Sequence, residues 1–484
     1  MTQIDIITIL PVITLTVWAC VLLLVDMFIP KDRKGQTALI AATGLALTMA
    51  ICLIQSAQAP ATVSGFNGMV VLDGFSNFLS LLFLLTGLFG IAVAYGYLNR
   101  MKIDRGEYYV IILICTAGMM LMAQATDLII TFLSLELLSI PLYVLAAFAY
   151  PRSESEEAGI KYFLLGAFST GFVVYGIALT FGATGTTGFE GIVGAVSAGT
   201  ANSSLLLIGA ALILVGFGFK VGLVPFHMWT PDVYQGAPTP VTAFMAAGAK
   251  AAGFAALLRV FATAFPSLAS DLMPVLAVLS ALTMIIGNVI AIAQTDIKRM
   301  LAYSSIAQAG YILMAFVPFA DPAVRLVSVA AGLFYLVAYT ITSFGSWGVV
   351  IALEKAQGKG LAIADYAGLG KKYPLLAAAM TIFMLSLAGL PPTLGLVGKL
   401  YLFRAVMQGG IYWLALIGVL TSLVSAYYYL RVVVTMYMKD GSPQITRDAW
   451  LEFTIAVCAI GIVIFSFVPQ SLFAWASQAV LKLF

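Results

Sequence analysis

Apolar segments, each about 20 residues long, follow one another along almost the whole chain. A helix of that length crosses the hydrocarbon core of a bilayer, where every backbone polar group must be bonded within the protein. The composition agrees with this, because 62% of the 484 residues are hydrophobic and 9% are charged, whereas a soluble domain carries about 25% charged residues. The sequence therefore predicts an all-α polytopic membrane protein.

Fourteen segments meet this length requirement, and we expect a short amphipathic tail over 471–484 after the last of them. The glycine-rich segment 182–203 lacks the strand and the Lys-Ser/Thr pair of a phosphate-binding loop, so we expect a plain connection there. The net charge of +3 is not gathered in a basic tail or stripe, which argues against a nucleic-acid partner. The predicted spans are 6–29, 37–58, 70–97, 108–123, 126–149, 158–181, 204–230, 239–264, 271–294, 297–319, 325–352, 375–407, 411–437 and 449–468.

Positively charged side chains concentrate in alternate loops between the predicted spans. The intervening segments 59–69 and 182–203 contain no Lys or Arg. Because loops on the inner side of a membrane carry an excess of these residues, we expect both termini on the outer side. The basic residues of the predicted inner loops are Lys31, Arg33 and Lys34; Arg100, Lys102 and Arg105; Arg152; Lys298 and Arg299; Lys355, Lys359, Lys371 and Lys372; Lys439 and Arg447.

Two of the spans combine a lysine with a proline. Pro225 follows Lys220 in the seventh span, and Pro391-Pro392 precedes Lys399 in the twelfth. A proline has no N–H to donate, and its ring clashes with the carbonyl four residues before it. The sequence therefore predicts two broken helices. Broken helices inside a membrane tend to line ion sites.

Two distant parts of the chain repeat a short pattern. Thr126-Asp127-Leu128 opens one span, and Thr295-Asp296-Ile297 opens another 169 residues later. The same shift carries Pro225 to position 394, close to Pro391-Pro392. Since the copies are an odd number of spans apart, the two units would face opposite ways across the membrane. The sequence thus predicts an inverted repeat.

Four charged residues lie near the middle of predicted spans: Glu136, Lys220, Lys250 and Lys399. Each isolated charge costs about 2.5–3.5 kcal/mol there, or roughly 10–14 kcal/mol together, unless pairing or water reduces it. A Glu136–Lys220 pair would keep both groups charged, and its separation would favour loss of the lysine proton. The pattern predicts a proton relay, with a static salt bridge that fixes helix packing as the alternative.

The lysines have a second, simpler explanation. Lys161, Lys250 and Lys399 could extend their amines to the nearest membrane interface, although Lys250 and Lys399 lie deep in their spans and Lys161 lies nearer the inner end. In the twelfth span, the double proline would leave the carbonyls of Leu387 and Ala388 without helical donors, free to hold water. Polar residues extend the line of charges: Tyr303, Ser304, Ser305, Gln308, Tyr335, Tyr339, Thr340 and Ser343.

The remaining reactive side chains do not form a cofactor site in the sequence. The four cysteines, Cys20, Cys52, Cys115 and Cys458, lie in apolar segments without metal-ligand spacing. His227 is the only histidine, and we expect it to make a loop hydrogen bond. Glu354 stands beside Lys355 at the end of a span, where we expect an interface pair. No redox centre is predicted on this chain.

At these residues the chain resembles the antiporter-like membrane subunits of respiratory complex I, the proton-pumping NADH:quinone oxidoreductase. The resemblance runs from the fifth predicted span to the twelfth. Within the family, the VYQGAP corner and a lysine at position 399 distinguish the chain from the M type of subunit. The segments that carry the resemblance are SLELLSIPLYVL at 134–145, EAGIKYFLLGA at 157–167, FKVGLVPFHMWTPDVYQGAPTPVTAF at 219–244, TDIKRMLAYSSIAQAGY at 295–311 and GLPPTLGLVGKLYLF at 389–403.

This resemblance implies a fold of 14 transmembrane helices with two inverted five-helix repeats and two broken helices. It implies four parts: an N-terminal three-helix segment, 1–107; a first repeat, 108–264; a second, inverted repeat, 271–437; and the last span with its tail, 438–484.

The resemblance also assigns roles to the buried charges. It implies that Glu136 pairs with Lys220 and that Lys161 modulates this pair. Lys250 would be the relay in the eighth span. Lys399 would exchange protons with the outer side.

The resemblance further implies that the redox chemistry takes place on other chains. NAD, FMN, iron–sulfur clusters and quinone are expected on partner subunits. The expected neighbours are the antiporter-like subunit M and the small subunits K and J, within the lipid bilayer of a bacterial inner membrane.

Two other functions stay open at the level of the sequence. Related stand-alone cation/proton antiporters share the same set of residues, and a passive membrane scaffold could use the charges only to hold helices together. One carboxylate among several lysines suits protons better than Na⁺, which prefers oxygen ligands.

Overall fold

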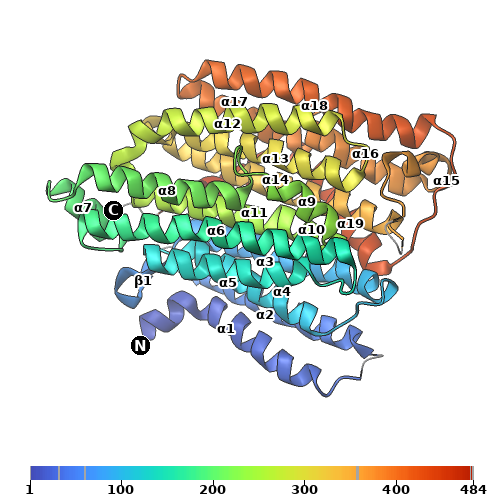
Figure 1. Ribbon diagram of the computed structural model, residues 1–484, viewed down its shortest axis with the longest axis horizontal. Helices are drawn as coiled ribbons and strands as arrows, with labels where there is room; N and C mark the ends of the chain where they lie inside the picture. Colours follow the sequence, from blue (N-terminus) through green and yellow to red (C-terminus); the bar gives the residue numbers. More distant parts are fainter. Residues whose placement is uncertain (1, 31–32, 59–61, 356–358, 480, 482–484) are drawn as a thin grey trace.

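The computed structural model describes residues 2–30, 33–58, 62–355, 359–479 and 481. Lys31, residues 59–61 of a predicted bare loop, and residues 480 and 482–484 of the predicted tail lie outside this range. The helices lie side by side in one bundle, with α1 along one edge and α18 along the opposite edge (Figure 1). The predicted all-α membrane class is confirmed.

Within the described residues, thirteen helices are long and apolar enough to cross a membrane. Two shorter helices, α16 (Pro374–Ala388) and α17 (Leu394–Gln408), together occupy the predicted twelfth span. The thirteen are α1 (Gln3–Asp26), α2 (Gly35–Gln58), α3 (Gly74–Arg100), α4 (Glu107–Gln124), α5 (Leu128–Ala146), α6 (Ser153–Thr184), α8 (Ser203–Val221), the continuous span of α10 (Thr239–Phe244), η3 (Met245–Ala249) and α11 (Lys250–Thr263), η4 (Pro266–Leu268) with α12 (Ala269–Ile292), α13 (Ile297–Phe316) with η5 (Val317–Ala320), α14 (Pro322–Leu353), α18 (Tyr412–Met438) and α19 (Ala449–Phe467).

Two predicted segments differ from the structure. Residues predicted to begin the third span form the strand β2 (Val70–Leu72), which pairs antiparallel with β1 (Val63–Gly65) across the short turn η2 (Phe66–Gly68). The predicted plain connection 182–203 contains the helix α7 (Phe189–Ser197), which buries apolar side chains against the bundle. Short apolar runs fit a strand or a helix equally well, so the sequence pattern did not separate them.

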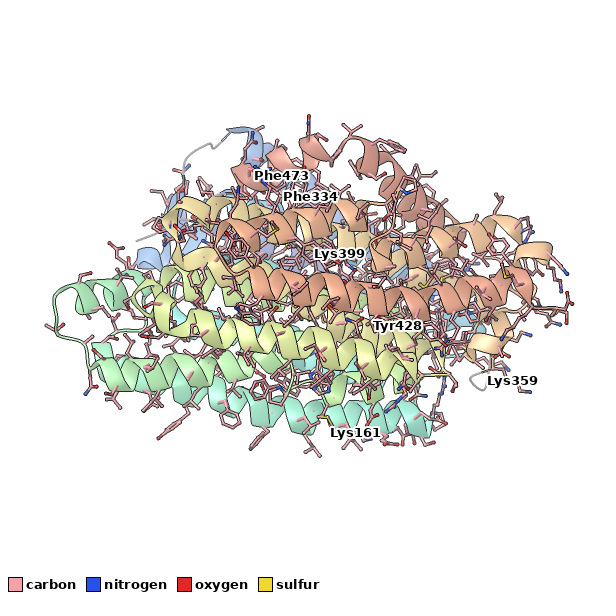
Figure 2. The ribbon with its side chains drawn as sticks, turned by 90° about the horizontal axis from the view of Figure 1, so that it is seen from above. Lys161, Phe334, Lys359, Lys399, Tyr428 and Phe473 are labelled. Carbon is pink, nitrogen blue, oxygen red and sulfur yellow. The ribbon has the colours of Figure 1, made fainter. Side chains whose placement is uncertain are left out.

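The chain ends in a short helix that packs against the bundle. This helix, α20 (Pro469–Gln478), buries Leu472 and Ala476. The ring of Phe473 stacks on Tyr401 at 4.1 Å and lies beside Phe334 (Figure 2). The predicted amphipathic tail is therefore a helix seated on α14 and α17.

Both predicted helix breaks end on a glycine in the left-handed conformation. Gly222 (φ 76°) follows α8, and Gly389 (φ 80°) follows α16. The next N–H groups, of Leu223 and Leu390, bond back to carbonyls at 2.8 and 2.9 Å, which is the usual glycine termination of a helix. The two glycines are 167 residues apart, so Pro392 and not position 394 matches Pro225. The short helices α9 (Trp229–Gly236) and α15 (Leu369–Lys372) and the turn η7 (Ile363–Tyr366) complete the connections.

The two copies of the Thr-Asp pattern begin their helices in the same way. Asp127 caps α5 and bridges to Gly188, whereas Asp296 caps α13 and bridges to Ala362. A side-chain oxygen at this position satisfies N–H groups that have no partner within the helix. These matched contacts support a repeat, although the predicted part boundaries stay a prediction.

Candidate functional site

The first buried lysine is held among three helices. Lys220 on α8 donates from Nζ to the Ser139 hydroxyl on α5 at 2.7 Å, and its amine lies 3.4 Å from the Tyr162 hydroxyl on α6. The Glu136 carboxylate accepts a hydrogen bond from Thr170 on α6 at 2.8 Å. Within the described residues Glu136 and Lys220 form no direct ion pair. The Ser139 hydroxyl, which accepts the Lys220 bond, donates to the Leu135 carbonyl at 2.6 Å, and Glu136 lies one helical turn before Ser139 on α5.

A glycine lets a neighbouring helix approach this lysine. A Cβ atom at Gly253 on α11 would lie 2.6 Å from Val221 Cγ1 and 3.4 Å from Lys220 Cγ. Lys250 is one turn before Gly253 and therefore on the same face of α11. The backbone of α11 thus runs from the surroundings of Lys220 to those of Lys250.

The second buried lysine begins α11, directly after the π-helical turn η3. Such turns are rare and frequently lie at functional sites. Lys250 Nζ donates to the carbonyl and hydroxyl oxygens of Ser305 on α13, at 2.6 and 2.5 Å. Tyr339 on α14 donates to the same hydroxyl at 2.8 Å. In the 169-residue shift, Ser305 is the counterpart of Glu136.

The third buried lysine closes the second helix break. Lys399 Nζ donates to the carbonyls of Leu387 and Ala388, both at 3.0 Å, and to the Ser422 hydroxyl at 2.8 Å. Its amine also lies 4.5 Å from the centre of the Tyr311 ring. The prediction that these two carbonyls are free of helical donors is confirmed, and they accept instead from the side chains of Lys399, Gln308 and Ser422.

Polar side chains connect the second lysine to the third. Gln308 Nε2 donates to the Leu387 carbonyl at 3.0 Å, and the Tyr335 hydroxyl donates to Gln308 Oε1 at 2.5 Å. The Tyr429 hydroxyl lies 3.3 Å from Gln308 Nε2 and 2.5 Å from the Ser304 hydroxyl. Ser304 adjoins Ser305 in α13, so the hydrogen-bonded groups around Lys250 and Lys399 end on neighbouring residues.

Of the other predicted members of the polar line, the Ser343 side chain bonds Tyr339, whereas Tyr303 and Thr340 do not join this connection. Tyr303 is only half buried and lies under Arg299, whose guanidinium is 6.0 Å from its ring. The Thr340 hydroxyl is buried without a hydrogen-bond partner in the part of the chain that the structure describes, as is His227 Nδ1. Among the residues that complete the connection, Ser139, Tyr429 and Ser422 were not singled out in the sequence.

Lys161 lies apart from the buried lysines. In Figure 2 it is at the edge of the molecule, whereas Lys399 is near the centre. Its amine pairs with Asp232 on α9 at 2.8 Å and with Glu157 at 2.7 Å. Arg299 on α13 pairs with the other oxygen of Asp232 at 3.0 Å. Asp232 therefore joins α6 and α13, a role that the sequence analysis did not assign to it.

We expect Asp232→Asn to change stability only slightly. Burial alone would raise the pKa of Asp232, but the hydrogen bonds and charges of Lys161 and Arg299 lower it below its ordinary value of 3.8. The stabilisation is therefore present above pH 3.8 and is lost as the pH falls through the lowered pKa. Since the side chains of this pair are more than a third exposed, the effect at neutral pH should be about 1 kcal/mol or less. Thermal midpoints of the assembled protein at neutral and acidic pH, with Glu157→Gln as control, measure it.

The described residues contain no group of three or more His, Cys, Asp or Glu side chains placed to hold a metal ion. What the site does contain is a line of buried amines, hydroxyls and freed carbonyls along two broken helices. Each of these groups can bind, donate or pass on a proton. This fold and this line of residues define an antiporter-like membrane subunit.

Comparison with known proteins agrees with that class. A family model described as NADH:quinone oxidoreductase/Mrp antiporter, transmembrane region, matches residues 125–425. The NADH-quinone oxidoreductase subunit N of Trichlorobacter lovleyi is 48% identical over 476 residues, which cover 98% of this chain and 96% of that protein. The chain belongs to the family of NADH-quinone oxidoreductase subunit N proteins.

Solved structures share the fold at different levels of identity. A chain in respiratory complex I from Thermus thermophilus with bound aureothin is 35% identical, with a TM-score of 0.82 over 96% of this chain and 99% of that one. A chain in the Mrp complex from Dietzia sp. has a TM-score of 0.86 over 99% of this chain and 97% of that one, but only 21% identity. The second likeness therefore concerns the fold alone.

Proposed function

We propose that this chain moves protons outward across the membrane as a subunit of an NADH:quinone oxidoreductase, through a relay of Glu136, Lys220, Lys250 and Lys399. The observation that carries the proposal is a pair of hydrogen-bonded groups that end on neighbouring residues: Lys250 bonds Ser305, and Ser304 bonds Tyr429, which bonds Gln308 beside the Leu387 carbonyl that Lys399 also bonds. A proton path needs groups that both donate and accept, and hydroxyl and amide side chains do so.

The three buried lysines have different surroundings, which suits different roles. Lys220 bonds Ser139, and Glu136 lies one helical turn before Ser139 on α5, so the charge of Lys220 would depend on its distance from the Glu136 carboxylate. Lys250 contacts only neutral groups in its hydrogen bonds. Lys399 lies among freed carbonyls next to Ser422. We propose that Lys220 loads the proton, that Lys250 passes it on, and that Lys399 releases it towards the outer side.

The chemistry that drives the relay would lie elsewhere in the assembly. We propose that NAD, FMN, iron–sulfur clusters and quinone are bound by partner subunits, and that this chain carries no redox centre. Its proposed neighbours are subunits M, K and J in a bacterial inner membrane, with both termini outside. The 35% identity to a complex I chain over nearly the whole length supports this assembly.

Lys220→Ala and Glu136→Gln test the relay in the assembled complex. We expect normal assembly and a loss of the proton pumping that accompanies NADH oxidation, because each change removes one charge of the loading pair. Lys372→Ala, at an exposed lysine, is the control. Normal pumping by both variants contradicts the relay, and a loss of assembly alone supports a passive scaffold. Co-purification with cation/proton antiporter partners and no NADH:quinone activity would indicate a stand-alone antiporter.

A further inference from the structure

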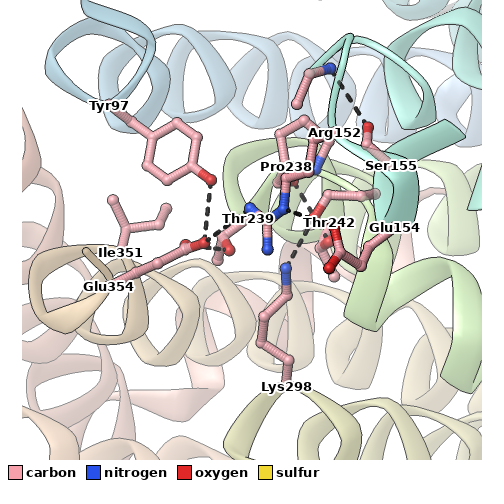
Figure 3. A network of polar contacts seen from close by, with 12 residues as sticks. Tyr97, Arg152, Glu154, Ser155, Pro238, Thr239, Thr242, Lys298, Ile351 and Glu354 are labelled. Carbon is pink, nitrogen blue, oxygen red and sulfur yellow. Dashed lines mark hydrogen bonds and ion pairs between the residues drawn. The ribbon is translucent and has the colours of Figure 1, made fainter. Parts of the chain in front are cut away.

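A second cluster of buried charge lies at the inner end of the bundle, outside the relay. Glu354 follows the last residue of α14 and is fully buried. Its carboxylate accepts hydrogen bonds from the Tyr97 hydroxyl on α3 at 3.2 Å and the Thr239 hydroxyl on α10 at 2.5 Å (Figure 3). The interface pair expected with Lys355 is not formed, because Lys355 donates to Gln444 instead.

Positive groups surround this carboxylate. Arg152 Nη1, at the start of α6, lies 3.9 Å from Glu354 Oε1. Lys298 on α13 is also fully buried and donates to the Ala237 carbonyl at 2.8 Å, next to the segment that carries Thr239 (Figure 3). Hydroxyl donors and positive charge therefore compensate a carboxylate that is buried away from solvent.

A polar cleft at the inner surface opens near this cluster, with Arg100 on its wall. The cleft has a volume of about 540 Å³, and its lining includes Arg33, Tyr95, Asn99, Arg100, Asp104 and Asp448. Asp104 Oδ1 and Arg100 Nε are buried without a hydrogen-bond partner in the described part of the chain, and buried polar atoms of this kind are commonly bonded to water. Burial raises the pKa of the Asp104 carboxyl group above its ordinary value, and so towards neutral pH.

Arg100 and Tyr97 connect the cleft to the buried carboxylate. Arg100 Nη2 donates to the Ile351 carbonyl at 2.7 Å, one turn before Glu354 on α14. Its guanidinium lies 5.5 Å from the ring of Tyr97, whose hydroxyl bonds Glu354. Arg100 on the cleft wall and Tyr97 behind it therefore form a line of contacts from the cleft to Glu354.

The cluster and the relay are also close to each other along α13. Lys298 precedes Ser305 by seven residues, or two turns of α13, so the two lie on one face about 10 Å apart. Ser305 is the residue that holds the Lys250 amine. Tyr234 on α9, fully buried, reaches the Ser305 hydroxyl from the side of the cluster, and its carbonyl accepts a hydrogen bond from Thr242 on α10.

We propose that Glu354 is the proton-accepting group of an inner intake route, which takes protons from water in the cleft and delivers them past Lys298 and Tyr234 to Lys250. The inference rests on the relay proposed above. In the first step a hydronium ion in the cleft gives a proton to the Glu354 carboxylate and becomes water. In the second step the carboxyl group gives up that proton, the Tyr234 and Ser305 hydroxyls relay it, the neutral amine of Lys250 accepts it and becomes an ammonium group, and Glu354 is again an anion.

Glu354→Gln tests the route in the assembled complex. Glutamine keeps the shape and accepts the same hydroxyl donors, but it cannot carry a proton. We expect assembly as in the parent and proton pumping reduced to the residual level of Lys250→Met, whereas Glu354→Asp, which keeps the carboxyl group, should restore part of it. If Glu354→Gln pumps like the parent, or if the Asp and Gln variants are equally impaired, Glu354 is a structural anchor and the intake route is wrong.

Lys250→Met in the same vesicles separates the two proposals. If Lys250→Met abolishes pumping and Glu354→Gln does not, the relay stands and the intake route fails. If Lys250→Met pumps normally, the relay itself fails.

A chemical block of the cleft provides a measurement that does not depend on the folding of Glu354 variants. Asn99 lines the cleft and is exposed. We expect that Asn99→Cys reacts with a bulky charged thiol reagent added from the inner side and that pumping then stops. Controls are the parent chain with the reagent and Lys371→Cys. Unchanged pumping after labelling, or an introduced thiol that the reagent cannot reach from the inner side, would overturn the route.

Discussion

Replacing Lys250 by methionine should leave the complex assembled and abolish the proton pumping that passes through this chain. Lys250 is 3% exposed, and its amine donates to both the carbonyl and the hydroxyl oxygen of Ser305. Methionine fills a similar volume without a charge. Replacement of a buried charge by an apolar side chain of the same size is often neutral for stability, provided that no partner charge is left behind. No carboxylate contacts Lys250 in its hydrogen bonds, so none is left unpaired.

Function should respond differently from stability. Among the hydrogen bonds of the described residues, those of the Lys250 amine are the only ones that join α11 to Ser305. The Lys250→Met variant loses them. Groups that transfer protons typically contribute about 10²–10⁴-fold to the rate of the step they serve. We therefore expect proton transfer through this chain to fall by about 100-fold or more.

The measurement is proton uptake into inverted vesicles during NADH oxidation, recorded together with quinone reduction. Lys371→Met is the matched control, since this lysine is 72% exposed and pairs with Asp440 at the surface. Pumping by Lys250→Met at the control rate would exclude Lys250 from the relay. A variant that fails to assemble would show that the lysine holds the helices together instead.

The spans and the helix breaks were predictable because their signals are local. A run of about 20 apolar residues and a proline inside it act on the backbone where they stand. The partners of the charged residues were not predictable in this way. Ser139 and Lys220 are 81 residues apart, and Glu354 lies at a predicted interface but is buried by α3, α6 and α10. Such contacts depend on which helices pack together.

The spacing of the internal repeat was also predicted only in part. The 169-residue shift aligns Asp127 with Asp296, whereas the helix breaks at Gly222 and Gly389 align at 167 residues. The two spacings differ by two residues, and a shift of two residues rotates side chains by more than half a turn of a helix. Lys399 follows its helix break, whereas Lys220 precedes its own. The spacing of the prolines did not predict that the two lysines would therefore contact different groups.

One further charged residue lies at membrane depth and was not among the candidates predicted from the sequence. Arg259 lies in the predicted eighth span, and the cost that drew attention to the lysines applies to it equally. In the structure its guanidinium makes a two-fold contact with Asp73, at 2.6 and 2.8 Å, and both side chains are 1% exposed. It also donates to the Ala123 carbonyl and lies 4.7 Å from the ring of Phe75.

We expect Arg259→Met to destabilise the assembled protein by about 3–5 kcal/mol, the usual cost of leaving one member of a buried ion pair without its partner. The thermal midpoint of the intact complex measures this. The double variant Arg259→Met/Asp73→Asn should recover much of the loss, because asparagine carries no charge and still caps α3 as Asp73 does. The stability of Asp73→Asn alone should lie between those of Arg259→Met and the double variant, since Arg259 keeps its carbonyl acceptor on Ala123.

The double variant also decides which part of the Arg259 contact carries the cost. If it is no more stable than Arg259→Met, the lost packing of the guanidinium, and not the orphaned carboxylate, accounts for the destabilisation, and the coupling energy of the cycle approaches zero. In either case pumping per NADH oxidised should remain at the parent level in the molecules that stay assembled, because neither Arg259 nor Asp73 contacts the line from Lys220 to Lys399.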